Sequence, residues 1–149
     1  MAALGVVAIV LGVVGWVLSR RRSPSAIWAA EAGPLGAAGV GLHDTALSAL
    51  LAAGTASDPA RWSAAGVAAD QVTASLQRLE VSAPDDQARL LARQGIDTVT
   101  ALRSAIAVAE AAPPGSPLDE EAARVLRDRL NDATAALDAV TTRARSQNS

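Results

Sequence analysis

The chain has 149 residues, of which half are hydrophobic and only 2% aromatic, and its formal net charge at pH 7 is −2. Alanine is the commonest residue, with 36 copies, whereas Phe, Tyr, Cys and Lys are absent and His occurs once. An Ala-rich sequence with few aromatic residues favours helices over sheets. Without Cys there are no disulfides or thiolate sites, and a single His excludes a multi-histidine metal centre. The composition therefore predicts an all-α protein.

The first predicted element is a transmembrane helix over residues 2–19. This segment carries no charged side chain, and at 1.5 Å per residue it makes roughly 27 Å of helix, close to the thickness of the hydrocarbon layer. Trp16 lies near its end, where an indole suits the membrane interface, and Arg20, Arg21 and Arg22 follow as a charged stop. We expect these four residues to anchor the helix at the membrane interface.

Two alternatives compete with a permanent membrane anchor. A cleaved signal peptide carries its positive charge before the apolar stretch, whereas here the charge follows it. A buried core helix is seldom apolar on every side and ended by three arginines. The permanent anchor is therefore favoured. Because Arg accumulates on the cytoplasmic side of cell membranes, the sequence predicts an N-terminus outside and a cytoplasmic remainder.

Small residues line one face of this predicted membrane helix. Gly5, Ala8, Gly12 and Gly15 follow one another at intervals of three or four residues. Such a face lets helix backbones approach closely in lipid. We expect it to contact another helix, although Gly and Ala are frequent in membrane helices generally.

Residues 20–41 are predicted to be a basic juxtamembrane segment followed by a Gly/Pro/Ala-rich connector. Two Pro and a cluster of Gly surround one large apolar pair, Ile27 and Trp28. Since Gly and Pro disfavour helix interiors, we expect no regular helix over the full length of this stretch. Trp28 either covers one end of the following domain or dips into the headgroup region, and the first alternative is favoured.

Residues 42–145 are predicted to form the helical domain, and residues 146–149 a disordered tail. Apolar residues recur there at intervals of three and four, which indicates helices with one buried face. A short helix over 42–53 is followed by three long ones, which begin near Asp58-Pro59, near Pro84-Asp85-Asp86 and at 119. Short turns join them, so the sequence predicts a small antiparallel, up-and-down bundle. Its expected large core residues are Trp62, Leu76, Leu79, Leu91, Val99, Leu102, Ile106, Leu126, Leu130 and Leu137.

The sequence offers no convincing catalytic, cofactor-binding or metal-ligating residue. His43 is the only imidazole, and we expect it to be solvated or at a helix start. The acidic clusters 85–86 and 119–121 fall at predicted helix starts, where carboxylates favourably oppose the positive end of the helix dipole. No phosphate-binding glycine loop of the GxxxxGK[ST] type occurs.

The charge after residue 22 argues against nucleic acid as a partner. Residues 23–149 contain 10 Arg and 15 acidic residues, a net charge of −5, which phosphate backbones repel. The same charge predicts that the bundle stands off an anionic membrane surface to which the three preceding arginines are attracted.

These features predict a single-pass, non-catalytic accessory, scaffold or adaptor protein of the cell membrane. Its expected partners are the lipid bilayer and a protein or second copy, bound through the membrane helix or the bundle. The alternative is an envelope-facing helical sensor, or a lipid- or ligand-binding module, with the opposite topology. The Arg-only, Ala-rich usage is typical of bacterial genes of high GC content.

Overall fold

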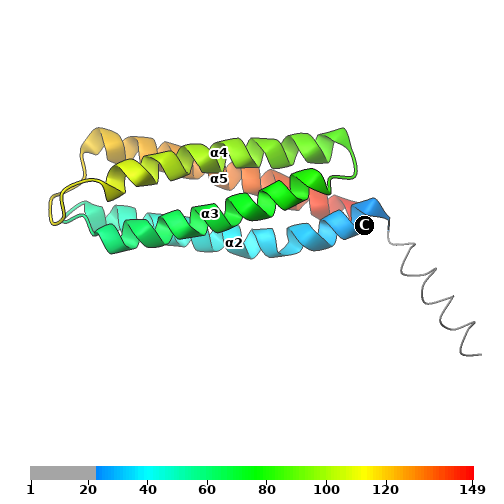
Figure 1. Ribbon diagram of the computed structural model, residues 1–149, viewed down its shortest axis with the longest axis horizontal. Coiled ribbons are helices and arrows are strands. Elements are labelled where there is room, and N and C mark those ends of the chain that lie inside the picture. The colour runs from blue at the N-terminus through cyan, green and yellow to red at the C-terminus, as the bar shows by residue number, and fades with distance from the viewer. Residues whose placement is uncertain (1–22) are drawn as a thin grey trace, which may run out of the picture.

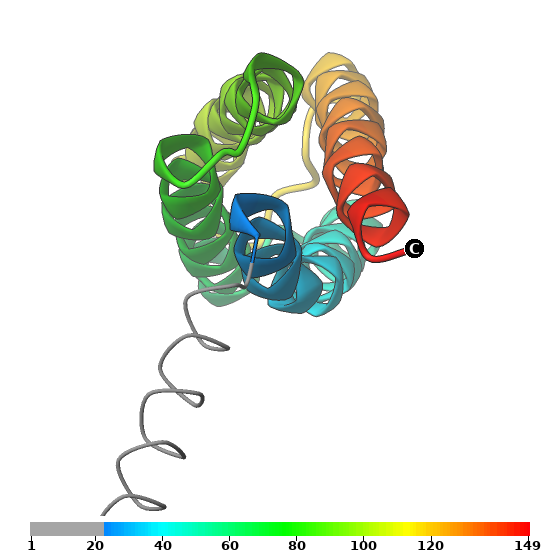
Figure 2. The same ribbon diagram turned by 90° about the vertical axis from the view of Figure 1, so that its right-hand side faces the viewer.

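The computed structural model describes residues 23–149, which form four antiparallel helices. Each consecutive pair packs side by side, and the last helix packs against the first, which closes a ring (Figure 1, Figure 2). No strand occurs in this part of the chain. The predicted all-α, up-and-down bundle is therefore confirmed. The helices are α2 (Pro24–Ala53), α3 (Pro59–Val81), α4 (Asp86–Glu110) and α5 (Glu120–Gln147).

The predicted connector is wrong from residue 24 onward, because this stretch forms the first half of α2. Pro24 fits the first helical position, where its missing N–H costs nothing, and Ser23 caps the helix by accepting a 3.3 Å hydrogen bond from the Ala26 N–H. Pro34 and four Gly lie inside the helix despite their low propensity. Burial of Trp28 and Leu35 shows why: tertiary packing of one face outweighs the weak local preference.

α2 is also the helix, within residues 23–149, that is long and apolar enough to cross a membrane. This assignment rests on the length and composition of α2 alone, and α2 lies near the N-terminus. In the bundle α2 packs against both α3 and α5. The predicted span over residues 2–19 lies outside the described residues.

The other helix boundaries follow the predicted stop and start signals. Asp58 caps α3 by accepting from the Ala60 N–H at 3.0 Å, and Pro59 is the first helical residue. Asp85 caps α4 by accepting from the Ala88 N–H at 2.7 Å. α5 continues through Gln147, two residues into the predicted disordered tail.

The core runs along the bundle axis and consists mostly of Ala and Leu from all four helices. Nine of the ten large residues expected in it are buried; Leu91 is the exception and is half-buried at the core's edge. Trp28 is a core residue that the sequence placed in the connector. Its indole Nε1 donates a 2.9 Å hydrogen bond to the Leu79 carbonyl of α3.

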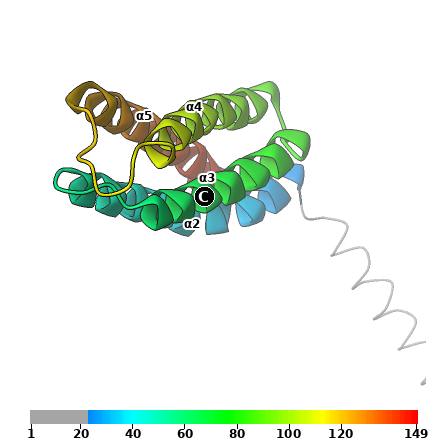
Figure 3. The same ribbon diagram turned by 60° about the vertical axis from the view of Figure 1, so that its left-hand side comes forward.

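The two ends of the bundle differ in construction. The chain enters α2 at one end, here named the entry end, together with the α3–α4 turn and the end of α5 (Figure 1). The opposite, loop end holds the α2–α3 and α4–α5 connections, which lie against each other (Figure 3). There Ser57 donates its N–H to the Ser116 carbonyl at 2.8 Å and accepts from the Gly115 N–H at 3.1 Å.

A buried serine reinforces the loop end. Ser57 is the one buried polar residue among residues 23–149. Its Oγ accepts a 3.1 Å hydrogen bond from the Trp62 indole. The Leu118 N–H donates to the Ala53 carbonyl at 2.9 Å, which ties the start of the α5 region to the end of α2. Both connections are thus held by hydrogen bonds to the other, and not only by their own helices.

Candidate functional site

An open groove with a volume of about 900 Å³ lies between α2 and α5. We name it the α2–α5 groove. It runs from the entry end to the middle of the bundle, and one wall comes from each helix. Its α2 wall comprises Ala29, Ala32, Gly33, Gly36, Gly39, Val40 and His43; its α5 wall comprises Asn131, Thr134, Ala135, Leu137, Asp138, Thr141, Ala144, Arg145 and Asn148.

Glycines set the shape of the α2 wall. A Cβ on Gly39 would lie 3.1 Å from Leu137 Cδ1, so the two helices touch there only because a side chain is missing. A Cβ on Gly36 would lie 3.8 Å from Thr141 Cγ2, an ordinary contact, and one on Gly33 would meet nothing within 4 Å. The groove therefore widens from Gly39 toward the entry end.

The α5 wall is mostly polar, but several of its polar groups are already engaged. The hydroxyl of Thr134 donates to the Leu130 carbonyl at 2.8 Å, and that of Thr141 donates to the Asp138 carbonyl at 3.0 Å. Arg145 and Asp138 form an exposed ion pair at 3.9 Å. One wall of the groove thus consists mainly of small apolar residues of α2. The other carries polar residues of α5, whose threonine hydroxyls already donate hydrogen bonds to carbonyls of α5.

His43 lies in the middle of α2 and not at a helix start, because the helix begins nineteen residues before it. Its Nδ1 is 3.2 Å from a carboxylate oxygen of Asp44, and its side chain is partly exposed at the edge of the groove. This is a contact between neighbouring side chains on the helix surface, open to solvent.

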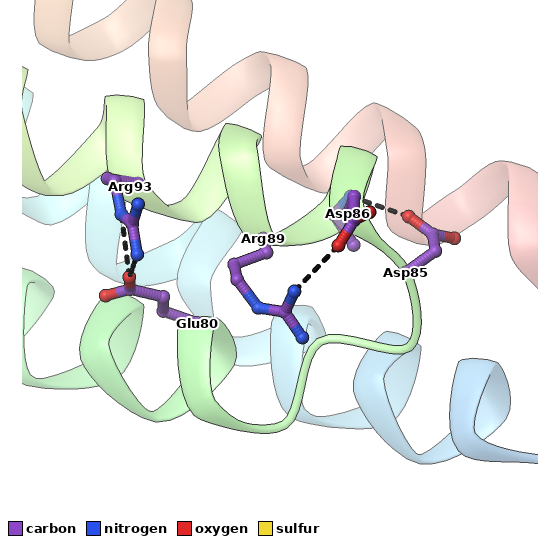
Figure 4. A network of polar contacts seen from close by, with 6 residues as sticks. Glu80, Asp85, Asp86, Arg89 and Arg93 are labelled. Atoms are coloured by element: carbon purple, nitrogen blue, oxygen red, sulfur yellow. Dashed lines mark hydrogen bonds and ion pairs between the residues drawn. The ribbon is translucent and has the colours of Figure 1, made fainter.

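The predicted acidic clusters occupy helix starts, as expected. At the start of α4, Asp85 caps the helix and Asp86 pairs with Arg89 at 2.8 Å (Figure 4). At the start of α5, Asp119 makes no side-chain cap, whereas Glu121 pairs with Arg124 at 2.7 Å. Both clusters thus lie at helix starts, and each contains one carboxylate that pairs with an arginine one turn further along the same helix.

Asp85 also links two elements that are distant in sequence. Besides capping α4, its second oxygen accepts a 3.0 Å hydrogen bond from Arg143 Nη2 of α5. The Ala88 N–H is the largest cause that lowers the pKa of Asp85 below its ordinary value of 3.8; burial opposes this, and Arg143 adds to it. The α3–α4 turn is thereby bound to the end of α5.

Two further ion pairs join α3 to α4. Arg93 donates to Glu80 Oε1 from both Nε and Nη2, at 2.9 and 2.7 Å, and this fork is visible in Figure 4. Arg103 reaches Asp70 at 3.2 Å beside a second, smaller hollow. Surface pairs of this kind contribute little to stability.

Within residues 23–149, no group of three or more His, Cys, Asp or Glu side chains lies close enough to hold a metal ion. The predicted membrane contact face of Gly5, Ala8, Gly12 and Gly15 lies outside the described residues. The same is true of the predicted anchors, which are Trp16, Arg20, Arg21 and Arg22. In comparisons with protein-family models, curated proteins and solved structures, no match was found.

The groove was missed at the sequence level because its α2 wall falls in the predicted connector. A usable signal was present: Gly33, Gly36 and Gly39 recur every three residues, which places them along one side of a helix. As helix-breaking residues these glycines indicated a loop. As one face of a helix they indicate a place where a neighbouring helix can pack closely.

Proposed function

We propose that this protein is a single-pass, membrane-anchored adaptor that acts by binding a partner protein and not by catalysis. In this proposal residues 2–19 cross the cell membrane with the N-terminus outside, and the bundle lies in the cytoplasm. The α2–α5 groove binds an amphipathic helix of the partner. The lipid bilayer and that helix are its two binding partners.

The observation that carries the proposal is the pairing of one apolar and one polar wall along an open groove. The α2 wall extends over residues 29–43, about four helical turns or roughly 21 Å. An amphipathic helix laid in such a groove turns its apolar side to the glycines and its polar side to the Asn, Thr and Asp of α5. Gly33 has open space above it, so a partner backbone can come close there.

Photocrosslinking in native membranes tests this binding site. A photoreactive residue at Val40, which lines the groove and is 61% exposed, should give one discrete adduct with another protein. The same residue at Val67, 55% exposed on α3 and outside the groove, is the matched control and should give none. Adducts of equal yield at both positions, or none at Val40, would contradict the proposal.

A pair of glycine substitutions sharpens that test. Gly33→Leu fills the open part of the groove, whereas Gly41→Leu adds the same side chain to α2 outside the groove, and neither added Cβ meets an atom within 4 Å. We expect Gly33→Leu to abolish the Val40 adduct and Gly41→Leu to leave it. An adduct with twice the chain's own mass would show that the groove binds a second copy of this chain and not a helix of another protein.

The opposite topology is a second candidate, with an envelope-facing bundle whose groove binds a lipid or small ligand. The groove's volume favours it, because about 900 Å³ falls within the range of ligand sites. The chain contains no Cys, so Ser149→Cys introduces a single thiol. Labelling of that thiol by an impermeant reagent on intact cells would support this second candidate; labelling only after lysis supports a cytoplasmic bundle.

A further inference from the structure

The acidic charge of the bundle is not spread evenly along its axis. In the half nearer the entry end, residues 23–38, 71–98 and 134–149, five Arg face six acidic residues. In the half nearer the loop end, residues 39–70 and 99–133, five Arg face nine acidic residues. Four of the five excess negative charges therefore lie in the half far from the point where the chain enters α2, so an anionic membrane repels mainly the loop end of the bundle.

The length of chain before α2 limits how far the entry end can lie from the bilayer. Five residue steps separate Ser19, the end of the apolar segment, from Pro24, the first residue of α2. A fully extended chain covers at most about 18 Å in five steps. Three of the residues between are arginines, which an anionic surface attracts. If residues 2–19 span the membrane, the entry end lies at its surface.

The entry end presents apolar side chains to solvent. Val81, the last residue of α3, is 86% exposed, and Ile27 in the first turns of α2 is 45% exposed. Ala83 and Pro84 follow in the α3–α4 turn and are half-buried. The carboxylates of this end are engaged: Glu31 accepts from Ser82, while the acidic residues of the α3–α4 turn and the end of α3 are paired as described above.

We propose that the entry end of the bundle rests on an anionic lipid surface, with the bundle axis directed away from the membrane and the loop end outermost. The surface consists of the first turns of α2, the α3–α4 turn with Val81, and the end of α5. An anionic surface attracts the three arginines and repels the acidic half, so charge and chain length favour the same orientation. This inference rests on the proposed membrane anchor.

Fluorescence quenching in vesicles tests this orientation with the full chain. Because the protein has no Cys, Val81→Cys, Val40→Cys and Val108→Cys each provide one labelling site, and all three valines are exposed. The labelled proteins are reconstituted into vesicles of equal parts phosphatidylglycerol and phosphatidylcholine, with and without a headgroup-nitroxide lipid. Val108 lies about 33 Å and Val40 about 24 Å along their helices from the entry end.

We expect the label at position 81 to show a roughly two-fold or greater loss of fluorescence, because it lies within the headgroup layer. The labels at 40 and 108 should be unaffected. Quenching at 40 together with 81 would show a bundle lying flat on α2, and no quenching at 81 would show a bundle held off the surface; both overturn the inference.

Co-flotation of the same samples separates the failure of this inference from that of the anchor. If the protein floats with the vesicles but position 81 is not quenched, the anchor stands and the orientation is wrong. If the protein does not float, the anchor fails, and the inference that rests on it fails as well.

Discussion

The indole of Trp28, fully buried between α2 and α3, donates its N–H to the backbone carbonyl of Leu79 at 2.9 Å. That carbonyl belongs to the last turn of α3, where the helix itself supplies no donor. One side chain therefore fills the core near the entry end and completes the hydrogen bonding of a neighbouring helix. The first half of α2 is thereby fixed to α3, although Pro34 and several Gly disfavour a helix there.

Trp28→Phe should destabilise the bundle by about 1–2 kcal/mol, because an aromatic ring remains while the Leu79 carbonyl loses its donor in a buried site. Urea unfolding of the full chain in detergent, followed by circular dichroism, measures this. Trp28→Ala should cost more, about 3–5 kcal/mol, since it also leaves a cavity. Equal stability of Trp28→Phe and the unsubstituted protein would show that the hydrogen bond contributes nothing.

Two glycines in helix interiors should respond to alanine in opposite directions. Gly41→Ala should stabilise the protein by about 0.5–1 kcal/mol, because alanine is the better helix former and the added Cβ meets nothing within 4 Å. At Gly95 the new Cβ would lie 3.0 Å from Cδ2 of Leu76, which is itself buried. Gly95→Ala should therefore destabilise by about 1 kcal/mol despite the gain in propensity. Thermal unfolding of both variants side by side checks the sign of each change.

Gly115 should tolerate alanine poorly because of its backbone. Its φ is +78°, in the region that side chains disfavour, so Gly115→Ala should cost about 1–2 kcal/mol even though there is space for the methyl group. Gly54 lies in the other connection of the loop end with a φ of −64° and is the matched control. Gly54→Ala should change the urea midpoint little, and similar losses from both substitutions would refute the backbone explanation.

The pH dependence of stability should contain a contribution from Asp85. The native structure lowers its pKa below 3.8, so the carboxylate stabilises the fold at neutral pH, and this stabilisation is lost as the pH falls through the lowered pKa. Asp85→Asn keeps a capping side chain but removes the charge. Its urea midpoint should lie below that of the unsubstituted protein at neutral pH and converge with it well below 3.8. Asp86→Asn, at a fully exposed side chain, should show a smaller difference at neutral pH.

The three helices after residue 58 were predictable because local and tertiary signals agree in them. Asp58 and Asp85 cap helices whose apolar residues recur every three or four positions, and the structure keeps both starts within about two residues. α2 was not predictable over its first half, since Gly33 and Pro34 argue locally against a helix. What overrides them is the burial of Trp28 by α3, which depends on contacts some fifty residues away in sequence.

The candidate site could not be predicted for the same reason. Its two walls belong to the first and last helices of the bundle, and pairing Gly39 with Leu137 requires knowing that these helices are neighbours. The roles of the acidic clusters, by contrast, followed from their place at helix starts. Asp85 shows the limit of that reasoning, because its contact with Arg143 of α5 has no local signature.

α2 and α5 are the one pair of adjacent helices in the ring that no turn connects. At the loop end the hydrogen bond from Leu118 to Ala53 holds them together, and toward the entry end the groove lies open between them. A molecule bound to both walls therefore holds together α2 and α5, the first and last helices of the bundle. Because such a molecule binds the folded bundle and not the separated helices, it raises the free energy of unfolding by an amount that grows with its concentration relative to its Kd.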